Sequence, residues 1–295
     1  MTTPRIVLVT GATAGIGRAT ALHLAKQGHR VFASGRRAHA LESLAKEAAG
    51  TKLETLVLDV TKPESIAAAK AEILERTDGY GIDALVNNAG YGSVGPLEEV
   101  SDEKLRAQYE TNVFGLMAMT RAFLPEMRAR RSGRIINVSS VGGRLTFPMM
   151  GAYNSTKYAV ESLSDALRVE LRPFGVKVVI IEPGSIATEF ADVAMGTIPE
   201  AQGSAYAGAI AEADAFRAKF DGTAVGPEHV ARAIETAVVA KRPAARYVRP
   251  WRTYALLWAF SWLPTSWMDA LLARMTGLTE RKLAASASSA ALAQA

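Results

Sequence analysis

The sequence predicts an α/β fold: a doubly wound parallel sheet of about seven strands with helices on both faces, in a single domain with a helical C-terminal extension. Short β-branched apolar runs alternate with longer helical patterns along most of the chain. Glycine and polar clusters follow the ends of these runs, where open parallel sheets bind ligands. A length of 295 residues and a hydrophobic content of 49% suit one large domain with a substantial core.

The first strand leads directly into a glycine turn and a helix. Residues 5–10 form a short apolar run typical of a strand buried on both faces. Gly11, Gly15 and Gly17 follow, and a helical pattern covers residues 16–27. Such glycines let the backbone approach a pyrophosphate, and the helix N-terminus offers free N–H groups and a positive dipole end. We therefore expect a dinucleotide site, with a mere tight connection as the alternative.

The second strand, at residues 30–34, ends in Gly35-Arg36-Arg37. Such folds read the adenosine ribose near this position. A carboxylate there would accept a hydrogen bond from a free 2′-hydroxyl. Arginines instead attract a 2′-phosphate and can bind it through two parallel hydrogen bonds. No acid occurs in residues 31–41. The sequence therefore favours NADP(H) over NAD(H), the alternative being a solvated basic loop.

The same alternation continues to about residue 188. We expect strands at residues 53–58, 84–86, 134–138 and 176–181, and helices at 63–76, 101–131 and 153–171. Glycine or polar residues follow these strands at 59–60, 87–90, 139–140 and 183–188. Parallel strands align their carboxyl ends, so these residues should share one edge of the sheet. This shared placement is a stronger sign of a ligand site than any single motif.

Tyr153 and Lys157 are four residues apart, which places them on one face of a helix. A nearby ammonium favours the phenolate, so we expect the pKa of Tyr153 to fall below its usual ~10 and to suit proton transfer near neutrality. Ser139 and Ser140 end the preceding strand, and adjacent strand residues point to opposite faces, so only one can reach this pair. A Tyr-x-x-x-Lys pair alone is common by chance and gains meaning only from the other motifs.

In the order of these motifs the chain resembles the short-chain dehydrogenase/reductase family, which has a Rossmann-type fold, over roughly residues 5–240. The stretch 147–153 resembles the hydroxysteroid and retinol dehydrogenase branch. The motifs that carry the resemblance are Thr10-Gly11-x-x-x-Gly15-Ile16-Gly17, Asp59-Val60, Asn87-Asn88-Ala89-Gly90, Asn112, Ser140, Tyr153-x-x-x-Lys157 and Pro183-Gly184-x-x-x-Thr188.

The resemblance implies a catalytic set of Asn112, Ser140, Tyr153 and Lys157. Tyr153 would be the general acid/base, and Lys157 would lower its pKa and bind the nicotinamide ribose. Ser140, preferred over Ser139 by the family's spacing of 13, would hold the substrate oxygen, and Asn112 would support a water that links Lys157 to solvent. The NADP(H)-binding residues would be Gly11, Thr13, Gly15, Ile16, Gly17, Arg36, Arg37, Asp59, Val60, Asn88, Ala89, Gly90, Tyr153, Lys157, Pro183, Gly184, Ile186 and Thr188.

Apolar side chains flank the expected catalytic residues and predict an apolar substrate. The candidate substrate-binding residues are Leu145, Phe147, Met149, Met150 and Phe190. Residues 189–221 are expected to form a substrate lid. We expect a lipophilic secondary alcohol and its ketone, of hydroxysteroid or retinol type. The alternatives are a 3-oxoacyl-thioester reductase of the same family and a non-catalytic nucleotide-sensing or membrane-surface scaffold.

The chain departs from a minimal family member after the expected NADP-binding catalytic domain, residues 1–245. All four tryptophans lie in residues 251–267, close to Arg246, Arg249 and Arg252. This aromatic and basic extension, residues 246–283, is compatible with covering the pocket, packing an interface or touching a membrane peripherally through residues 246–275. Residues 284–295 are expected to be a flexible tail.

Composition excludes several other kinds of site. The absence of cysteine excludes a thiol nucleophile, disulfides and cysteine-ligated zinc, and four scattered histidines predict no metal site. A net charge of +5 is mild, and we expect no nucleic-acid partner. The first strand begins near residue 5 and the longest apolar run has 11 residues, so we expect no signal peptide or transmembrane span and a cytoplasmic location. The resemblance implies a homodimer or homotetramer.

Overall fold

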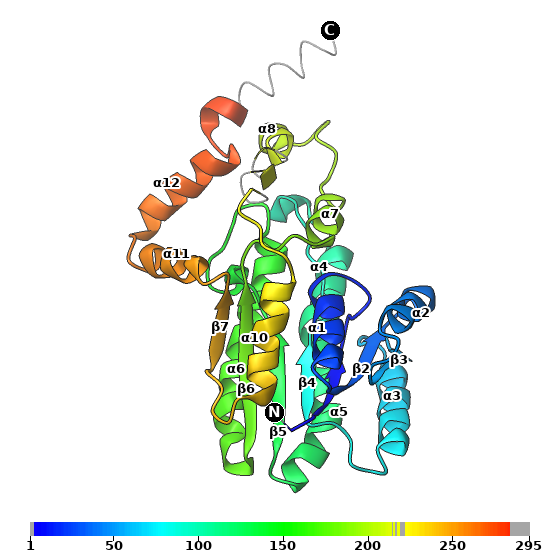
Figure 1. Cartoon of the computed structure of the whole chain (residues 1–295). Coiled ribbons are helices and arrows are strands. Elements are labelled where there is room, and N and C mark those ends of the chain that lie inside the picture. The colour runs from blue at the N-terminus through cyan, green and yellow to red at the C-terminus, as the bar shows by residue number, and fades with distance from the viewer. Residues whose placement is uncertain (1–2, 214, 216, 219–221, 284–295) are drawn as a thin grey trace.

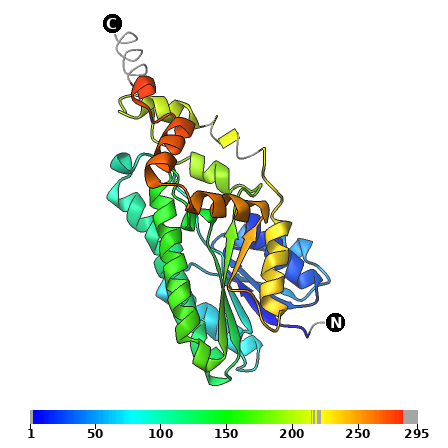
Figure 2. The ribbon, with the colours of Figure 1, turned by 90° about the vertical axis from the view of Figure 1, so that its left-hand side faces the viewer.

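The structure, a computed structural model, describes residues 3–213, 215, 217–218 and 222–283. Seven parallel strands form one sheet in the order β3-β2-β1-β4-β5-β6-β7, with helices on both faces, which confirms the predicted architecture (Figures 1 and 2). The strands are β1 (Ile6–Val9), β2 (Arg30–Gly35), β3 (Leu53–Val57), β4 (Ala84–Asn87), β5 (Gly133–Val138), β6 (Val176–Pro183) and β7 (Arg246–Arg249). The strand order reverses between β1 and β4, and such a switch point opens a ligand crevice at the carboxyl ends.

The helices form two layers around the sheet. They are α1 (Gly15–Lys26), α2 (Ala38–Glu47), α3 (Pro63–Arg76), α4 (Asp102–Tyr109), α5 (Leu116–Ala129), α6 (Gly151–Glu170), α7 (Phe190–Met195), α8 (Ala207–Ala211), α10 (Glu228–Val239), α11 (Arg252–Ser261) and α12 (Thr265–Thr276). One core lies between the sheet and α1, α2 and α10, and the other between the sheet and α3, α5 and α6. Val7 and Val9 enter the first core and Leu8 the second, because successive strand residues point to opposite faces. Burial on both faces explains why the strands are continuously apolar.

The predicted helix at 101–131 is interrupted. A π-helical segment, Glu110–Gly115, separates α4 from α5. A Cβ on Gly115 would lie 2.9 Å from the Val60 carbonyl oxygen, so the widened turn passes close to the end of β3. A π-helical turn inserts one residue into the helical repeat, and such insertions often mark functional sites.

The sheet extends beyond the boundary expected at residue 245. β7 begins at Arg246 and pairs in parallel with Ile180–Pro183 of β6, so the helical extension starts after Arg249. Within it, α11 and α12 lie at the carboxyl end of the sheet (Figure 2). Across the described part of the chain, no helix combines the length and apolar character needed to cross a membrane. The tail expected at 284–295 lies outside the described residues.

Candidate active site

The glycine turn between β1 and α1 has the geometry of an anion-binding loop. Gly11 and Gly15 adopt φ angles of +65° and +51°, in the left-handed region that favours glycine. A Cβ on Gly17 would lie 2.3 Å from the Gly11 carbonyl oxygen and 2.4 Å from the Asn88 amide nitrogen. α1 begins after Ala14 without a side-chain cap and without an acid in its first turn, so its N–H groups face the crevice unopposed by a carboxylate. These features fit the pyrophosphate of a dinucleotide.

Asn88 fixes the other side of this crevice. Its amide donates hydrogen bonds to the carbonyl oxygens of Thr10 at 2.9 Å and Gly11 at 3.2 Å. The backbone N–H groups of Asn88 and Ala89 both donate to the Thr10 hydroxyl at 3.0 Å. Thr188, beyond the end of β6, places its Cβ and methyl group 3.3 Å from a Cβ built on Gly15. The predicted cofactor residues of three strand ends therefore meet around one crevice.

Two arginines lie at the ribose end of the crevice. Arg36 and Arg37 are exposed, and Arg37 donates to the Thr13 hydroxyl at 3.3 Å. Burial opposes ionisation of Asp59, yet hydrogen bonds from Thr61 and the positive charge of Arg36 hold the pKa of Asp59 below its usual value. Arg36 therefore stands between the ends of β2 and β3, at the position where the sequence places a 2′-phosphate contact.

Tyr153, Lys157 and Ser140 come together beside this crevice. Tyr153 and Lys157 are 6% and 7% exposed on α6, and Ser140 follows the end of β5. The Ser140 hydroxyl accepts from the Gly142 N–H at 3.0 Å, donates to the Pro183 carbonyl at 3.5 Å and lies near enough to the Tyr153 hydroxyl to favour its ionisation. Lys157 donates to the Val138 carbonyl at 2.9 Å, and its Nζ lies 5.7 Å from the centre of the Tyr153 ring. The arrangement presents a phenol and a hydroxyl to a common point.

The pKa of Tyr153 moves in the direction opposite to the one expected. Burial raises it to about 12 and outweighs the effect of the nearby Ser140 hydroxyl. Burial also lowers the pKa of Lys157 to about 8, although the carboxylate of Glu161 acts in the other sense. The expected lowering of the Tyr153 pKa is therefore wrong for the protein alone. The reason is geometric, because the ammonium is bonded to the Val138 carbonyl and both groups lie in an apolar environment.

Asn112 lies in the π-helical segment and forms hydrogen bonds to Tyr91 and to Thr156 of α6. Its amide donates to the Tyr91 carbonyl at 2.9 Å and to the Thr156 hydroxyl at 3.0 Å, and its oxygen accepts from the Tyr91 N–H at 3.1 Å. A Cβ on Gly90 would lie 3.0 Å from the Asn112 oxygen and 3.8 Å from Lys157 Nζ. Asn112 thus ties the chain after β4 to α6 next to Lys157.

Of the predicted substrate-binding residues, Phe190 contacts Tyr153 directly. Phe190, the first residue of α7, places its ring centre 5.4 Å from that of Tyr153. Leu145, Phe147, Met149 and Met150 are all partly buried in the loop between β5 and α6. Phe190 is thus in ring contact with the Tyr153 phenol, and the assignment of the four loop residues to a substrate site stays a prediction.

Asn154, which the sequence analysis missed, fixes that loop. Its oxygen accepts from the Phe147 N–H at 3.0 Å and its amide donates to the Gly142 carbonyl at 3.0 Å. A Cβ on Gly142 would lie 2.3 Å from the Asn154 amide nitrogen, so glycine is required there. Asn154 follows Tyr153 directly, and that adjacency is the only sequence signal for its role.

A buried pair of acids behind the site was also missed. Glu182, at the end of β6, is 0% exposed; burial, and then the charge of Glu161, raise its pKa to about 7, against the opposing charges of Arg144 and Arg246. Burial likewise raises the pKa of Glu161, against the nearby Ser139 side chain and the charge of Arg246. Ser139 thus faces Glu161 while Ser140 faces the phenol, the alternation expected of a strand.

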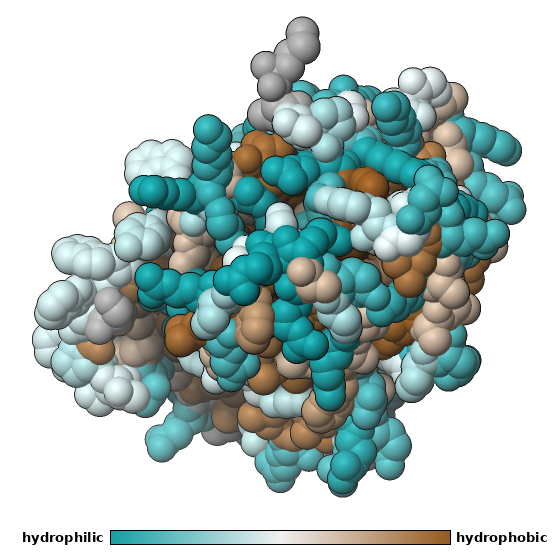
Figure 3. Space-filling view, turned by 90° about the horizontal axis from the view of Figure 1, so that it is seen from below, coloured by the Kyte–Doolittle hydropathy of each residue, from teal (hydrophilic) through white to brown (hydrophobic). Residues whose placement is uncertain are grey.

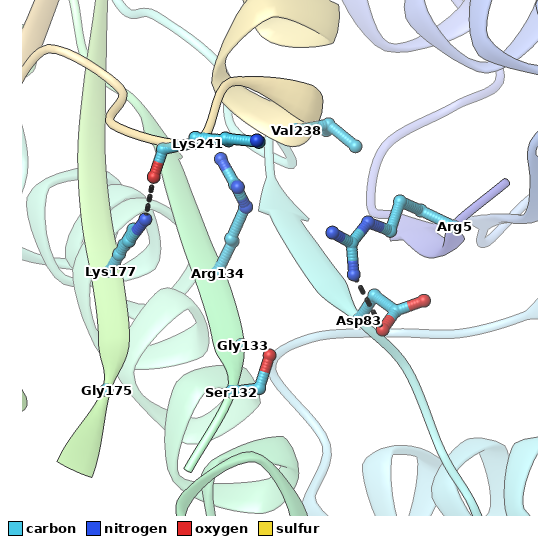
Figure 4. A pocket seen from close by; sticks show the side chains of 9 residues that line it. All are labelled: Arg5, Asp83, Ser132, Gly133, Arg134, Gly175, Lys177, Val238 and Lys241. Atoms are coloured by element: carbon cyan, nitrogen blue, oxygen red, sulfur yellow. Dashed lines mark hydrogen bonds and ion pairs between the residues drawn. The ribbon is translucent and has the colours of Figure 1, made fainter. Parts of the chain in front are cut away.

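The opposite end of the sheet carries a separate cavity of about 250 Å³ (Figure 4). Its lining includes Arg5, Asp83, Arg134 and Lys177, at the amino ends of the strands. Hydrophilic side chains predominate over this end of the molecule (Figure 3). The buried guanidinium of Arg134 is already bonded to the carbonyl oxygens of Ala237 and Ala240. The cavity is remote from Tyr153 and takes no part in the catalytic arrangement.

Comparison with known proteins gives concordant matches. Residues 5–197 match the family model described as short chain dehydrogenase. The chain is 36% identical over 270 residues to 3-ketodihydrosphingosine reductase of Bacteroides thetaiotaomicron, covering 91% of this chain and 97% of that protein. It is 36% identical over 266 residues to human 17-beta-hydroxysteroid dehydrogenase type 1, covering 85% and 79%. A solved short-chain dehydrogenase from Streptomyces avermitilis has a TM-score of 0.75 and 36% identity, covering 93% of this chain and 96% of that one.

Proposed function

The chain belongs to the short-chain dehydrogenase/reductase family, and from that premise we propose that it is an NADP-dependent oxidoreductase interconverting a lipophilic secondary alcohol and its ketone. Membership makes it an oxidoreductase of alcohol or ketone substrates that uses a nicotinamide cofactor. The cofactor preference and the substrate class are our proposal. The observation that carries it is the buried Tyr153 side chain, which has Ser140 beside its hydroxyl and the Phe190 ring against its own ring.

The proposed mechanism assigns proton transfer to this chain and hydride chemistry to the cofactor. When bound, the nicotinamide supplies the hydride that is exchanged with the carbinol carbon. In the reducing direction the Tyr153 hydroxyl donates its proton to the carbonyl oxygen. Ser140 holds that oxygen by a hydrogen bond, and the Lys157 ammonium provides positive charge beside the phenol. A pKa of about 12 keeps Tyr153 protonated at neutral pH, which is the state that a proton donor needs.

Support for NADP(H) comes from the residues at the ends of β2 and β3. Arg36 is exposed, near enough to Asp59 to lower its pKa, and no acid stands in residues 31–41 to bind a free 2′-hydroxyl. Arg36→Ala should weaken NADPH binding at least ~10-fold more than NADH binding, because a charge-assisted phosphate contact is lost. Fluorescence titration of both cofactors measures this. Equal weakening of the two would contradict the preference.

Support for a lipophilic substrate comes from the side chains around Tyr153 and from the relatives. Phe190 covers the phenol, and the loop before α6 adds four apolar side chains. Two relatives are named for a sphingoid ketone and for a steroid alcohol. We also propose a homodimer or homotetramer, because α6 and the segment before α5 expose Phe114, Tyr158 and Val169 by 43% or more.

The decisive experiment compares Tyr153→Phe with the native enzyme on a panel of steroid, retinoid, sphingoid and acyl-thioester ketones, followed by NADPH absorbance. The variant should keep cofactor affinity and lose at least ~10²-fold in turnover, because only the proton donor is removed. Turnover near the native level would overturn the mechanism. Preference for small polar ketones would overturn the substrate class and leave the mechanism standing.

A further inference from the structure

The C-terminal helix pair presents a face that the proposed function does not use. Trp251, Tyr254, Trp258 and Trp262 follow one another at intervals of three or four residues, so they align along one side of α11. Their exposed fractions are 77%, 59%, 62% and 75%, and Trp267, in the first turn of α12, is 67% exposed. We call these five residues the aromatic face. Aromatic side chains gathered in the open to this extent mark an interaction surface.

The other side of the helix pair is fixed to the body of the protein. Leu257 of α11 and Leu272 of α12 are 8% and 7% exposed. The Arg252 guanidinium donates to the Thr223 carbonyl at 2.8 Å, and a Cβ on Gly184 would lie 2.9 Å from the Thr253 hydroxyl. The pair is therefore anchored beside the end of β6, at the carboxyl edge of the sheet (Figure 2). Its inner side covers the protein, and the aromatic face points away from it.

Cations flank the first tryptophan of the aromatic face. Arg249 precedes Trp251 by two residues and Arg252 follows it directly, whereas the nearest acid after the face in sequence is Asp269 of α12. A cavity of about 380 Å³ adjoins the face and is lined by His229, Arg232, Arg249 and Trp251, among others. Arg232 lies on α10, and Arg249 ends β7, so two elements bring cations to the first tryptophan. Tryptophan with arginine is the combination that suits the headgroup level of a bilayer with negative surface charge.

We propose that the aromatic face docks on an anionic phospholipid bilayer, with its tryptophans among the headgroups and Arg232 and Arg249 against lipid phosphates. The contact is peripheral, because no helix in the described residues can span a bilayer. A second copy of this chain is a poorer occupant, since a two-fold interface would bring the same cations together. The proposal goes beyond the proposed function, because docking requires no substrate.

The test is co-sedimentation of the full chain with vesicles of phosphatidylcholine alone or with roughly one third phosphatidylglycerol. The protein should bind the anionic vesicles at least ~10-fold more tightly, and added salt should weaken this binding. Trp258→Ser with Trp262→Ser should lower the partition coefficient at least ~10-fold. Arg232→Gln with Arg249→Gln should lower binding to anionic vesicles and leave binding to neutral vesicles unchanged. Val57→Ser, which alters a 63% exposed residue of β3, is the matched control and should bind as the native chain does.

Two outcomes overturn the proposal: absence of binding to anionic vesicles, and equal binding by the native chain and the double tryptophan variant. Light scattering distinguishes the competing occupant. An interface between copies would show itself in two results together. The native chain would not bind vesicles, and the double tryptophan variant would have a lower oligomeric mass than the native chain. Reduction of a water-soluble ketone should be unchanged in these variants, because none alters a catalytic residue. Failure of docking is thereby separated from failure of the proposed function.

Discussion

Replacing Lys157 by methionine should stabilise the cofactor-free protein while abolishing its activity. Burial lowers the pKa of Lys157 from 10.5 to about 8, and this difference corresponds to about 3 kcal/mol spent on keeping the ammonium charged in the fold at neutral pH. The variant loses the hydrogen bond to the Val138 carbonyl, worth ~1–2 kcal/mol. Methionine has similar volume and needs no solvation. We therefore expect the free energy of unfolding at pH 7 to rise by about 1–2 kcal/mol.

The pH dependence of this gain identifies its cause. The folded pKa of Lys157 lies below the unfolded one, so the unfolded chain binds more protons between about pH 8 and 10.5. The native protein therefore gains stability from this residue as the pH rises through that window, whereas the variant does not. Urea unfolding should show that the difference in unfolding free energy between the variant and the native protein is smaller near pH 10 than at pH 7. Lys104→Met, on the exposed side of α4, should change stability by less than ~0.5 kcal/mol at either pH. A destabilised Lys157→Met protein, or a difference independent of pH, would refute the reasoning.

Two further substitutions test the crevice and the choice of serine. Gly17→Ala forces a Cβ to within 2.3 Å of the Gly11 carbonyl oxygen, so cofactor affinity measured by calorimetry should fall at least ~10-fold; unchanged affinity would show that the turn does not hold the pyrophosphate. Ser140→Ala should lower kcat by ~10²-fold, since its hydroxyl lies beside that of Tyr153, while Ser139→Ala, which faces Glu161, should change kcat by less than ~3-fold. Equal effects of the two serine substitutions on kcat would contradict the assignment.

The sheet could be predicted because its signals are local. Apolar strands of four to eight residues, each followed by polar or glycine residues, define both the parallel order and the functional edge. β7 was missed as a strand because Arg246 and Arg249 read as a basic flank, although a short strand with a charged residue at each end fits an edge position. Its pairing depends on β6, which no local pattern reports.

The π-helical turn could not be predicted from the sequence for a different reason. Helical periodicity in residues 101–131 is continuous enough to predict one helix, and the added residue at Glu110–Gly115 is stabilised by tertiary bonds from Asn112 to Tyr91 and Thr156. These partners lie 21 and 44 residues away in sequence. A side chain that bonds such distant groups can displace a helical repeat that local propensity would leave regular.

The protonation states of Tyr153 and Lys157 show how far a motif predicts chemistry. Four-residue spacing places both groups on one helix face, but burial determines their protonation. Burial raises the pKa of the Tyr153 phenol, which favours the neutral form, and lowers the pKa of the Lys157 ammonium. A neutral phenol beside an ammonium is the state that ketone reduction consumes, since the phenol gives up its proton and the nearby positive charge stabilises the resulting phenolate. Alcohol oxidation would need the phenolate first. Burial therefore keeps Tyr153 a proton donor in the cofactor-free protein, and we expect Lys157 to contribute most as the proton leaves.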